Sequence, residues 1–350
     1  MAIEIYKNSK IFVACPAGVA TGGPENLHQL VNLLRQKMHI NAYMYYYPLN
    51  KLVDPVNKNY KQYNNPYVTA VEDKQENILI VPEVYSGISL LKSYNNIRKI
   101  VYWLSVDNFY YWSSVVNFYL SGKFLLDQPV SIKMIKDITN YSLRGIRYNL
   151  VKDKYLKDVS YHLAQSHYAI NHLAKKGIPK DKIFYLSDYI NDAFLNAKID
   201  SSIKKDLVAY NPVKGYKFTR KIINHAKDIN FTSIKGLNRT GVIEKLKSTK
   251  VYIDFGNHPG KDRIPREAAI LGNCIITNRS GAANYYADIS IPDEYKFEEK
   301  SENINLIIKK INECISQYKD KNKDFKEYRK IIKSSKSQFL KDARAIFKKI

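Results

Sequence analysis

Short apolar runs alternate with helix-like segments along most of the chain, and this alternation restricts the fold more than any other feature of the sequence. Six apolar runs in the first half have the length of buried strands, at 11–15, 40–47, 78–81, 100–104, 162–166 and 183–186. After the first run, apolar side chains recur with the spacing of one helix face, at Leu27, Leu30, Val31 and Leu34. Strands that alternate with helices predict a mostly parallel sheet with helices on both faces.

The alternation restarts in the second half, after a polar, lysine-rich stretch at 196–206 that predicts a linker. Four further strands are expected there, at 207–210, 231–234, 251–255 and 274–277. Helices are expected between them, including one over 265–271 that ends at Gly272. The last fifty residues carry apolar stripes with helical spacing and are strongly basic from Lys319 onward. The sequence therefore predicts two α/β domains followed by helices.

A chain of 350 residues with 45% hydrophobic residues can bury the cores of two globular domains. Its formal net charge of +23 favours anionic partners such as nucleic acid, phospholipid or a diphosphate, although AT-rich codons also enrich Lys, Asn, Ile and Tyr. The three cysteines show no paired or metal-type spacing, which favours reduced thiols and a cytoplasmic location. Neither a signal peptide nor a membrane-spanning helix is expected.

The stretch from Val251 to Asn284 has the features of a ligand site at the edge of a parallel sheet. A buried strand ends near its start, a loop with two glycines follows, and Pro265 lies near the expected start of a helix. The carboxyl edge of such a sheet binds ligands in α/β proteins, and the first turn of a helix suits phosphate. Cations gather there, at Lys261, Arg263 and Arg266, and Glu267 in the first turn could accept two hydrogen bonds from a ribose diol. The competing interpretation is a solvated surface loop.

This stretch resembles the donor-binding part of glycosyltransferase family 4 and its bacterial relatives. The family has a glycine-rich loop, a proline, a Glu that leads into a small-residue helix, and a second glycine-containing loop. The matching residues here are Gly260, Pro265, Glu267-Ala268-Ala269, Gly272, Ile275-Ile276-Thr277 and Gly281-Ala282. The resemblance implies that Glu267 holds the nucleotide ribose. It also implies that Ser280, Gly281 and Ala282 approach the diphosphate or the sugar of the donor.

One departure from the family pattern limits what the resemblance implies. The family pairs its Glu with an acidic residue eight positions earlier, and Pro259 stands at that position here. Asp262 lies nearby, so Lys261, Asp262 and Arg263 form this chain's own version of the donor-binding loop. The contact to the donor sugar and the retaining stereochemistry of the family are therefore not implied for this chain.

Two other loops agree with the resemblance. The loop Asn211-Pro212-Val213-Lys214-Gly215 is similar to the family loop that places a basic residue against the donor diphosphate, which implies this role for Lys214. Gly22-Gly23 resembles the glycine loop on the acceptor side, in the first domain. Each of these patterns also occurs as a plain turn.

The fold that the resemblance implies is GT-B, in which two Rossmann-like α/β domains face a central cleft and C-terminal helices cross back to the first domain. The expected boundaries are 1–204 for the acceptor-side domain and 205–325 for the nucleotide-sugar-binding domain. Residues 326–350 are expected to form a basic helix that packs on the first domain.

The implied reaction moves a sugar from a nucleotide-sugar donor to an acceptor hydroxyl. Relatives stabilise the leaving diphosphate with basic side chains and helix ends, and this sequence has no Asp-x-Asp motif or His/Cys cluster, so neither a metal nor a cofactor is expected. An inverting enzyme also needs a base for the acceptor hydroxyl. Asp107, which follows the strand at 100–104, is the hypothesis for that base, and a turn or cap aspartate is its alternative. His28 and His258 are weaker candidates.

The expected partners are the nucleotide-sugar donor and a glycan or glycolipid acceptor, in the synthesis of bacterial surface polysaccharide or lipopolysaccharide. Aromatic residues crowd the region from Phe109 to Tyr119, and they and the basic C-terminal helices suit an anionic membrane surface as well as helix packing. Two other functions stay open. One is a non-catalytic GT-B protein that binds sugar or nucleotide. The other is nucleic-acid binding, which is not expected because no nucleic-acid motif is present.

Overall fold

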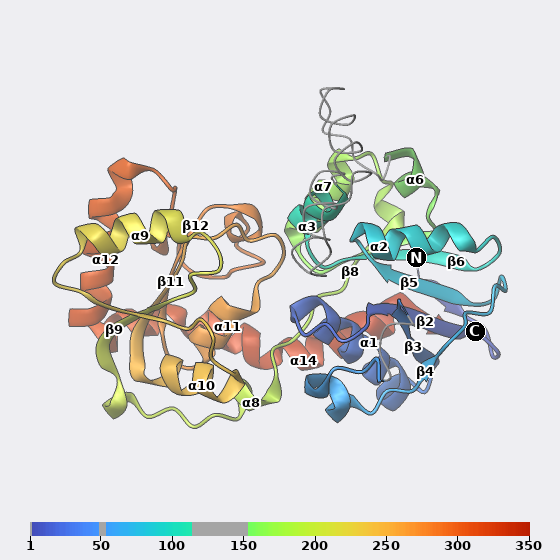
Figure 1. Ribbon diagram of the computed structural model, residues 1–350, viewed down its shortest axis with the longest axis horizontal. Helices are drawn as coiled ribbons and strands as arrows, with labels where there is room; N and C mark the ends of the chain where they lie inside the picture. Colours follow the sequence, from blue (N-terminus) through green and yellow to red (C-terminus); the bar gives the residue numbers. More distant parts are fainter. Residues whose placement is uncertain (1, 49–53, 114–152) are drawn as a thin grey trace, which may run out of the picture. The chain divides into compact units, whose positions relative to one another are not determined.

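The computed structural model describes residues 2–48, 54–113 and 153–350 (Figure 1). The chain divides into two compact units. The N-terminal unit combines Met1–Ser187 with Leu340–Ile350, and the C-terminal unit is Asp188–Phe339. Each unit is built around its own parallel sheet, as the alternation of strands and helices predicted.

The N-terminal unit contains a seven-stranded sheet in the order β4-β3-β2-β5-β6-β7-β8, and every pair is parallel. Its strands are β2 (Lys10–Pro16), β3 (Asn41–Tyr47), β4 (Tyr67–Val68), β5 (Ile78–Pro82), β6 (Arg98–Trp103), β7 (Tyr161–Ala164) and β8 (Ile183–Tyr185). The central strands β2 and β5 are buried on both faces, which is why they read as continuous apolar runs.

Most of the described helices of this unit follow the carboxyl end of a strand. The described helices are α1 (Gly22–Met38), α2 (Tyr85–Ile88), α3 (Val106–Ser113), α6 (Asp153–Asp158) and α7 (His167–Lys175), with short 3-10 helices at Lys58–Tyr63, Ser89–Ser93 and Lys180–Lys182. Helix α1 begins at Gly22, as predicted, and ends at His39, which adopts the left-handed conformation at φ 52°. No described helix is both long and apolar enough to cross a membrane.

The chain from Leu340 onward belongs to the N-terminal unit. Helix α14 (Lys326–Ile346) starts in the C-terminal unit, and β14 (Phe347–Lys349) pairs in parallel with β1 (Ile3–Ile5). The sequence predicted a helix that returns to the first domain. It did not predict the strand pair, because three residues are too few to give a periodic signal.

The C-terminal unit contains a five-stranded parallel sheet in the order β10-β9-β11-β12-β13. Its strands are β9 (Lys205–Tyr210), β10 (Asn230–Ser233), β11 (Thr249–Asp254), β12 (Cys274–Asn278) and β13 (Lys296–Phe297). Its helices are α8 (Asp192–Leu195), α9 (Tyr216–His225), α10 (Arg239–Ser248), α11 (Arg263–Ile270), α12 (Ile304–Ser316) and α13 (Tyr318–Lys321), with 3-10 helices at Ser201–Ile203, Gly281–Asn284, Asp293–Tyr295, Ser301–Asn303 and Asn322–Phe325.

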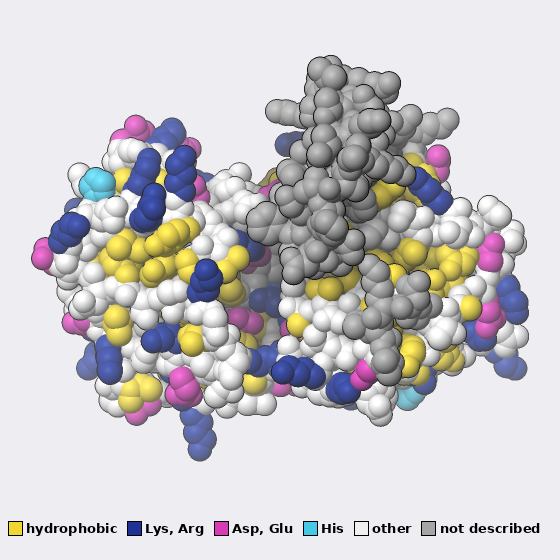
Figure 2. Space-filling view, in the orientation of Figure 1, with side chains coloured by type: hydrophobic (Ala, Val, Ile, Leu, Met, Phe, Trp, Pro, Cys, Tyr) yellow, Lys and Arg dark blue, Asp and Glu magenta, His cyan; other side chains and the backbone are white. Residues whose placement is uncertain are grey.

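Basic side chains cover the solvent faces of helices in this unit. Helix α9 buries Phe218 and Ile222 in the core and exposes Lys217, Arg220 and Lys221 on its opposite face. On the face drawn in Figure 2, Lys and Arg side chains stand on several elements of the C-terminal unit, with Asp and Glu side chains between them. The basic charge on this face is therefore dispersed over separate elements.

The division between the units falls at Ser187 and Asp188, whereas the sequence placed it at 204 and 205. Residues of the intervening segment pack into the C-terminal unit, where Ile190 and Phe194 are part of the hydrophobic core. The expected linker at 196–206 also contains a buried residue, Lys204. Its lysine-rich composition suggested a solvated segment, but the side chain of Lys204 turns inward.

The buried side chain of Lys204 binds carbonyls at the ends of two helices of the C-terminal unit. Its Nζ donates to the carbonyls of Leu246 (3.0 Å), Thr249 (2.7 Å) and Leu271 (2.9 Å), at the carboxyl ends of α10 and α11. Carbonyls at a helix end lack partners inside the helix, so a buried cation there satisfies them. Burial lowers the pKa of Lys204 to about 7.

Replacing Lys204 with Met should lower the free energy of unfolding by about 3 kcal/mol, because three buried carbonyls lose their donor. An unfolded lysine titrates near about pH 10.4, so between that pH and about 7 the unfolded chain binds more protons than the folded one. The free energy of unfolding should therefore rise with pH over this range in the wild type, and this rise should be absent in Lys204→Met. Urea unfolding at several pH values measures both effects.

The exposed neighbour Lys205 provides the control. Lys205→Met should keep both the wild-type stability and its pH dependence. Equal stability of Lys204→Met and Lys205→Met would contradict the role given to Lys204.

Candidate functional site

Three loops meet at the carboxyl edge of the C-terminal sheet, after β9, β11 and β12. These strands are neighbours in one parallel sheet, so their carboxyl ends lie side by side. The backbones touch so closely that two positions admit only glycine. A Cβ on Gly215 would lie 1.8 Å from the Phe255 carbonyl oxygen, and one on Gly281 would lie 2.0 Å from the His258 carbonyl oxygen. Both glycines also have positive φ, at 60° and 53°.

Lys214, which the sequence singled out in the first loop, contacts the second loop through an ion pair. Its Nζ lies 3.0 Å from Oδ1 and 3.2 Å from Oδ2 of Asp262. Asp262 occupies the N-cap position of α11, yet its side chain makes no capping hydrogen bond. Its carboxylate faces Lys214 and His258 instead, so the residue that begins the helix joins two loops.

His258 is fully buried between two carboxylates. Its Nδ1 lies 3.0 Å from Asp262 Oδ2, and its Nε2 lies 4.0 Å from Asp254 Oδ1. Burial lowers the pKa of His258, but Asp254 and Asp262 together outweigh it, so the pKa is raised. Burial likewise raises the pKa of Asp262, while His258 and Lys214 outweigh it and lower that pKa. These residues therefore form a connected set of charges, with His258 at its centre.

Asp254, His258 and Asp262 are also the described residues whose grouping could hold a metal ion, since one ligand atom of each lies within 4.8 Å of the others. The arrangement of the ring is unfavourable for such an ion. The two imidazole nitrogens face different carboxylates, so one ion cannot be bound by the ring and by both Asp residues in the observed conformation. In addition, the ammonium group of Lys214 already pairs with the Asp262 carboxylate, at the position where a metal ion would have to bind it.

The two arginines predicted to add positive charge at the site have a partner inside the unit. Arg266 is 2% exposed, and its Nη2 lies 2.7 Å from Asp188 Oδ1. Arg263 Nη2 lies 3.1 Å from the other oxygen of the same carboxylate. Burial raises the pKa of Asp188, but Arg266 and Arg263 outweigh it and lower that pKa. The sequence indicated cations near the loop but not the buried carboxylate, which lies 75 positions earlier than Arg263.

Arg266 also holds the loop before its own helix. Its Nη2 donates to the carbonyl of Lys261 (2.8 Å), and its Nε donates to the carbonyl of Asp262 (3.1 Å). Lys261 is itself 9% exposed. Arg266 thus stabilises the loop through two of its carbonyls, which the interpretation as a solvated surface loop did not suggest.

The third loop, after β12, contacts the second loop through a backbone hydrogen bond. The N–H of Ala282 donates to the His258 carbonyl (2.8 Å), and the N–H of Ser280 donates to Asn278 Oδ1 (3.1 Å). Gly281 begins a short 3-10 helix that ends at Asn284. The three residues that the sequence assigned to this loop therefore lie directly against the loop that carries His258.

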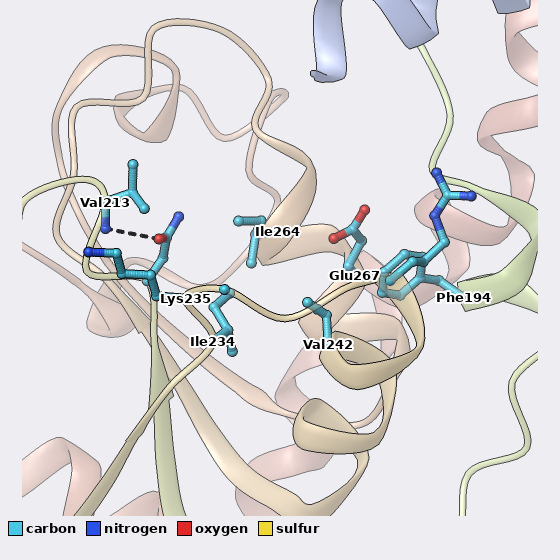
Figure 3. A pocket seen from close by; sticks show the side chains of 10 residues that line it. Phe194, Val213, Ile234, Lys235, Val242, Ile264 and Glu267 are labelled. Atoms are coloured by element: carbon cyan, nitrogen blue, oxygen red, sulfur yellow. Dashed lines mark hydrogen bonds between the residues drawn. The ribbon is translucent and has the colours of Figure 1, made fainter. Parts of the chain in front are cut away.

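A pocket of about 300 Å³ opens in the C-terminal unit beside the first of these loops. Its apolar lining comes from several elements, at Phe194, Val213, Ile234, Val242 and Ile264 (Figure 3). Its other lining residues are Asn211, Lys235, Gly236, Arg239 and Glu267. In Figure 3 the Glu267 carboxylate lies between Ile264 and Phe194. The pocket therefore combines a broad apolar wall with a carboxylate.

Glu267 lies deeper in its helix than the sequence indicated. Helix α11 begins at Arg263, two residues before the expected start, so Glu267 is its fifth residue and the first turn holds no acidic residue. The expected stabilisation of Glu267 by the first turn of the helix is therefore wrong. Pro265 still lies in the first turn, where a missing N–H is tolerated. The position of Glu267 instead turns its side chain toward the pocket.

The N-terminal unit carries the predicted acceptor-side residues. Gly22 and Gly23 are the first two residues of α1, after the N-cap residue Thr21. Asp107 is the second residue of α3, and its Oδ1 accepts a hydrogen bond from the hydroxyl of Tyr168 at 2.9 Å. Ser105 Oγ, rather than Asp107, accepts from a backbone N–H at the start of that helix, from Asn108 (3.2 Å). A side-chain acceptor at the start of α3 is therefore Ser105.

Glu83 is a titratable residue that the sequence analysis missed. It follows β5 directly, it is 2% exposed, and its Oε2 accepts a hydrogen bond from the N–H of Leu104 at 3.0 Å. Burial raises its pKa to about 8, so the carboxyl is mostly protonated at neutral pH. A single Glu after the run Ile78-Leu79-Ile80-Val81-Pro82 was the available signal.

Two other groups of predicted residues lie in the N-terminal unit. His28 is buried against the rings of Tyr60 and Tyr63, and burial lowers its pKa to about 4. In the aromatic region, Phe109 packs in the core beside Trp103, while Tyr110 is 40% exposed. Phe118 and Tyr119 lie outside the described residues, as do their neighbours in 114–152.

No protein-family model matches the sequence, and no curated protein matches it significantly. Solved structures do resemble it. The Anabaena protein HepE in complex with UDP is 11% identical, with a TM-score of 0.53 over 96% of this chain and 97% of HepE. Sucrose-phosphate synthase from Thermosynechococcus elongatus is 11% identical, with a TM-score of 0.55 over 95% of this chain and 98% of the synthase.

The lipopolysaccharide outer core galactosyltransferase WaaB is 12% identical, with a TM-score of 0.50 over 95% of this chain and 98% of WaaB. At these identities the likeness concerns the fold. Each unit of this chain has a parallel sheet with helices after its strands, and the structural match covers nearly the whole length of HepE and of the synthase. The chain has the GT-B fold of glycosyltransferases.

Proposed function

We propose that this protein is a glycosyltransferase that moves a sugar from a nucleotide-sugar donor to a glycan or glycolipid acceptor. The observation that carries the proposal is the pocket beside the first loop, at the carboxyl edge of a parallel sheet. It has an apolar wall and the Glu267 carboxylate, and Lys214 directly follows Val213 of its lining. The GT-B fold supports it, since HepE was solved with UDP and with UDP-glucose.

We assign the nucleoside of the donor to the pocket. The apolar side chains of Phe194, Val242 and Ile264 suit the faces of a base and a ribose. Glu267 can accept two hydrogen bonds from the ribose hydroxyls, and such charged hydrogen bonds are stronger than neutral ones. This is also the role that the resemblance to family 4 implied.

We assign the diphosphate to Lys214 and to the loop at Ser280, Gly281 and Ala282. During transfer, the acceptor oxygen bonds to the anomeric carbon while the bond from that carbon to the phosphate oxygen breaks. Negative charge then builds on the leaving diphosphate, and a lysine ammonium held at a loop edge stabilises it without reorganisation. Arg263 and Arg266 do not contact the diphosphate in this assignment. Both bind Asp188, and Arg266 also donates to the Lys261 carbonyl.

We assign the acceptor hydroxyl to Asp107 in an inverting reaction, in which its carboxylate takes the hydroxyl proton. The acceptor that we propose belongs to bacterial surface polysaccharide or lipopolysaccharide, for which the fold shared with WaaB gives support. The proposed reaction needs no metal. The proposed location is the cytoplasm, with attachment to the anionic inner face of the cell membrane.

A thermal-shift panel of UDP-, GDP-, ADP-, CMP- and dTDP-sugars tests the proposal, because a ligand that binds the folded chain raises its melting temperature. The expected result is a shift with one base, followed by donor hydrolysis or sugar transfer. Binding without either reaction would identify a non-catalytic sugar or nucleotide binder. Salt-sensitive binding of oligonucleotides, with no response to any nucleotide sugar, would favour nucleic-acid binding.

Replacing Glu267 with Ala should weaken the donor that gives the largest shift by about 10- to 100-fold, because the ribose loses a charged acceptor. Isothermal titration calorimetry measures the affinity. Glu244→Gln on the exposed face of α10 is the control and should bind as the wild type does. Wild-type affinity in Glu267→Ala would remove Glu267 from the donor site.

Replacing Asp107 with Asn should lower turnover by about 10²- to 10⁴-fold, because the amide cannot take the acceptor proton. Donor affinity should stay unchanged, since Asp107 belongs to the N-terminal unit and makes no donor contact in this assignment. Asp181→Asn, at an exposed position of the same unit, is the control. Steady-state kinetics with a fixed donor distinguishes the variants, and unchanged turnover in Asp107→Asn would exclude it as the base.

A further inference from the structure

His258 connects the three loops of the site through both its side chain and its backbone. Its Nδ1 lies 3.0 Å from Asp262, its Nε2 lies 4.0 Å from Asp254, and its carbonyl accepts from the N–H of Ala282. Asp262 in turn binds the Nζ of Lys214 with both of its oxygens. The position of Lys214 therefore depends on a carboxylate whose second partner is the imidazole.

The charged groups that face the imidazole come from each element packed around it. Asp254 ends β11, and its other oxygen accepts from the hydroxyl of Tyr252 at 2.9 Å. Asp262 precedes α11, and Lys214 follows β9. The loop after β12 contributes the backbone N–H of Ala282. The Nε2 atom is buried without a hydrogen-bond partner and lies 4.0 Å from Asp254 Oδ1, where that carboxylate favours a protonated ring.

We propose that His258 is a positioning residue for the donor diphosphate. Its imidazolium shares the Asp262 carboxylate with Lys214, so Lys214 is not the single cation that Asp262 binds. This inference rests on the proposed function, because it requires a diphosphate ligand at Lys214. With the imidazolium present, two cations face two carboxylates and the cluster is neutral. When His258 loses its proton, the cluster carries one net negative charge, which repels a diphosphate and strengthens the hold of Asp262 on Lys214.

The experiment compares nucleotide binding by the wild type and by His258→Asn across pH. Asparagine keeps an N–H donor near Asp262 but carries no titratable charge. The probes are UDP, GDP and ADP, and the one that binds the wild type most tightly is followed by calorimetry from about pH 6 to about pH 9. Taking the ratio of the two dissociation constants cancels the titration of the nucleotide itself.

The wild type is expected to bind the nucleotide about tenfold more tightly than His258→Asn near pH 6. The advantage should shrink as pH rises through the raised pKa of His258, which starts from an ordinary value of about 6.5. His225→Asn, at an exposed position of α9, is the matched control and should keep the wild-type profile.

The free protein gives a second readout that needs no ligand. A group whose pKa is raised by folding contributes its full stability below its unfolded pKa and loses that stability as pH rises through the folded value. The melting-temperature difference between wild type and His258→Asn should therefore be largest near about pH 6 and shrink above about pH 6.5. A difference that does not vary with pH contradicts a protonated His258.

The outcomes separate this inference from the proposed function. A pH-independent ratio of dissociation constants, with the wild type still binding nucleotide, overturns the positioning role and leaves the function standing. Failure of the wild type to bind any of the three nucleotides at any pH overturns the function, and the inference with it. Nucleotide binding by the wild type that is lost with EDTA and restored by Zn²⁺ or Mn²⁺, when binding by His258→Asn responds to neither, identifies a metal ion held by His258 and also overturns the inference.

Asp254→Asn tests the same idea if His258→Asn does not fold. It removes one of the two carboxylates that stabilise the imidazolium, so the pKa of His258 falls. The midpoint of the affinity–pH curve should move to lower pH by about one unit. An unmoved midpoint contradicts the proposal.

Discussion

The buried ion pair between Asp188 and Arg266 fixes the part of the molecule on which the candidate site depends. It joins the first residue of the C-terminal unit to helix α11, and the same guanidinium holds the carbonyls of Lys261 and Asp262. Removing one partner of such a pair leaves an uncompensated buried charge, which destabilises a protein more than losing a surface pair does. The pocket wall formed by α11 and the placement of Asp262 therefore both depend on this contact between distant parts of the sequence.

The sequence predicted the parts of the fold that a periodic pattern can encode. Buried strands such as β5 and β11 read as apolar runs, and α1 began at Gly22 as expected. Glu267 and the loop glycines were found because a short motif places them near each other along the chain. The partners of Arg266 and Lys204 could not be found in this way, since ion pairs and hydrogen bonds between distant residues leave no local pattern. The exact start of α11 also escaped, because Pro265 suggested the first helical position and is instead the third residue of the helix.

Ion pairs within the C-terminal unit reduce the positive charge that an anionic ligand would meet. The formal charge of +23 suggested a strongly cationic site, but Arg263 and Arg266 share Asp188, and Lys214 binds Asp262. A diphosphate would therefore exchange one anionic partner of Lys214 for another instead of meeting a bare cation. Such an exchange weakens the net attraction of Lys214 for an anionic ligand, because part of the new interaction replaces the existing pair with Asp262.

The parallel pairing of β1 with β14 has a consequence for the order in which the chain is made. Residues 3–5 leave the ribosome long before their partners 347–349, which follow only after both sheets have been translated. At typical elongation rates the delay is on the order of tens of seconds. The N-terminal unit can form its seven-stranded sheet in that time. Strand β1, which pairs only with β14 among the described strands, stays unpaired until the C-terminal unit has emerged. Assembly of the first unit is thus completed by the last described strand of the chain.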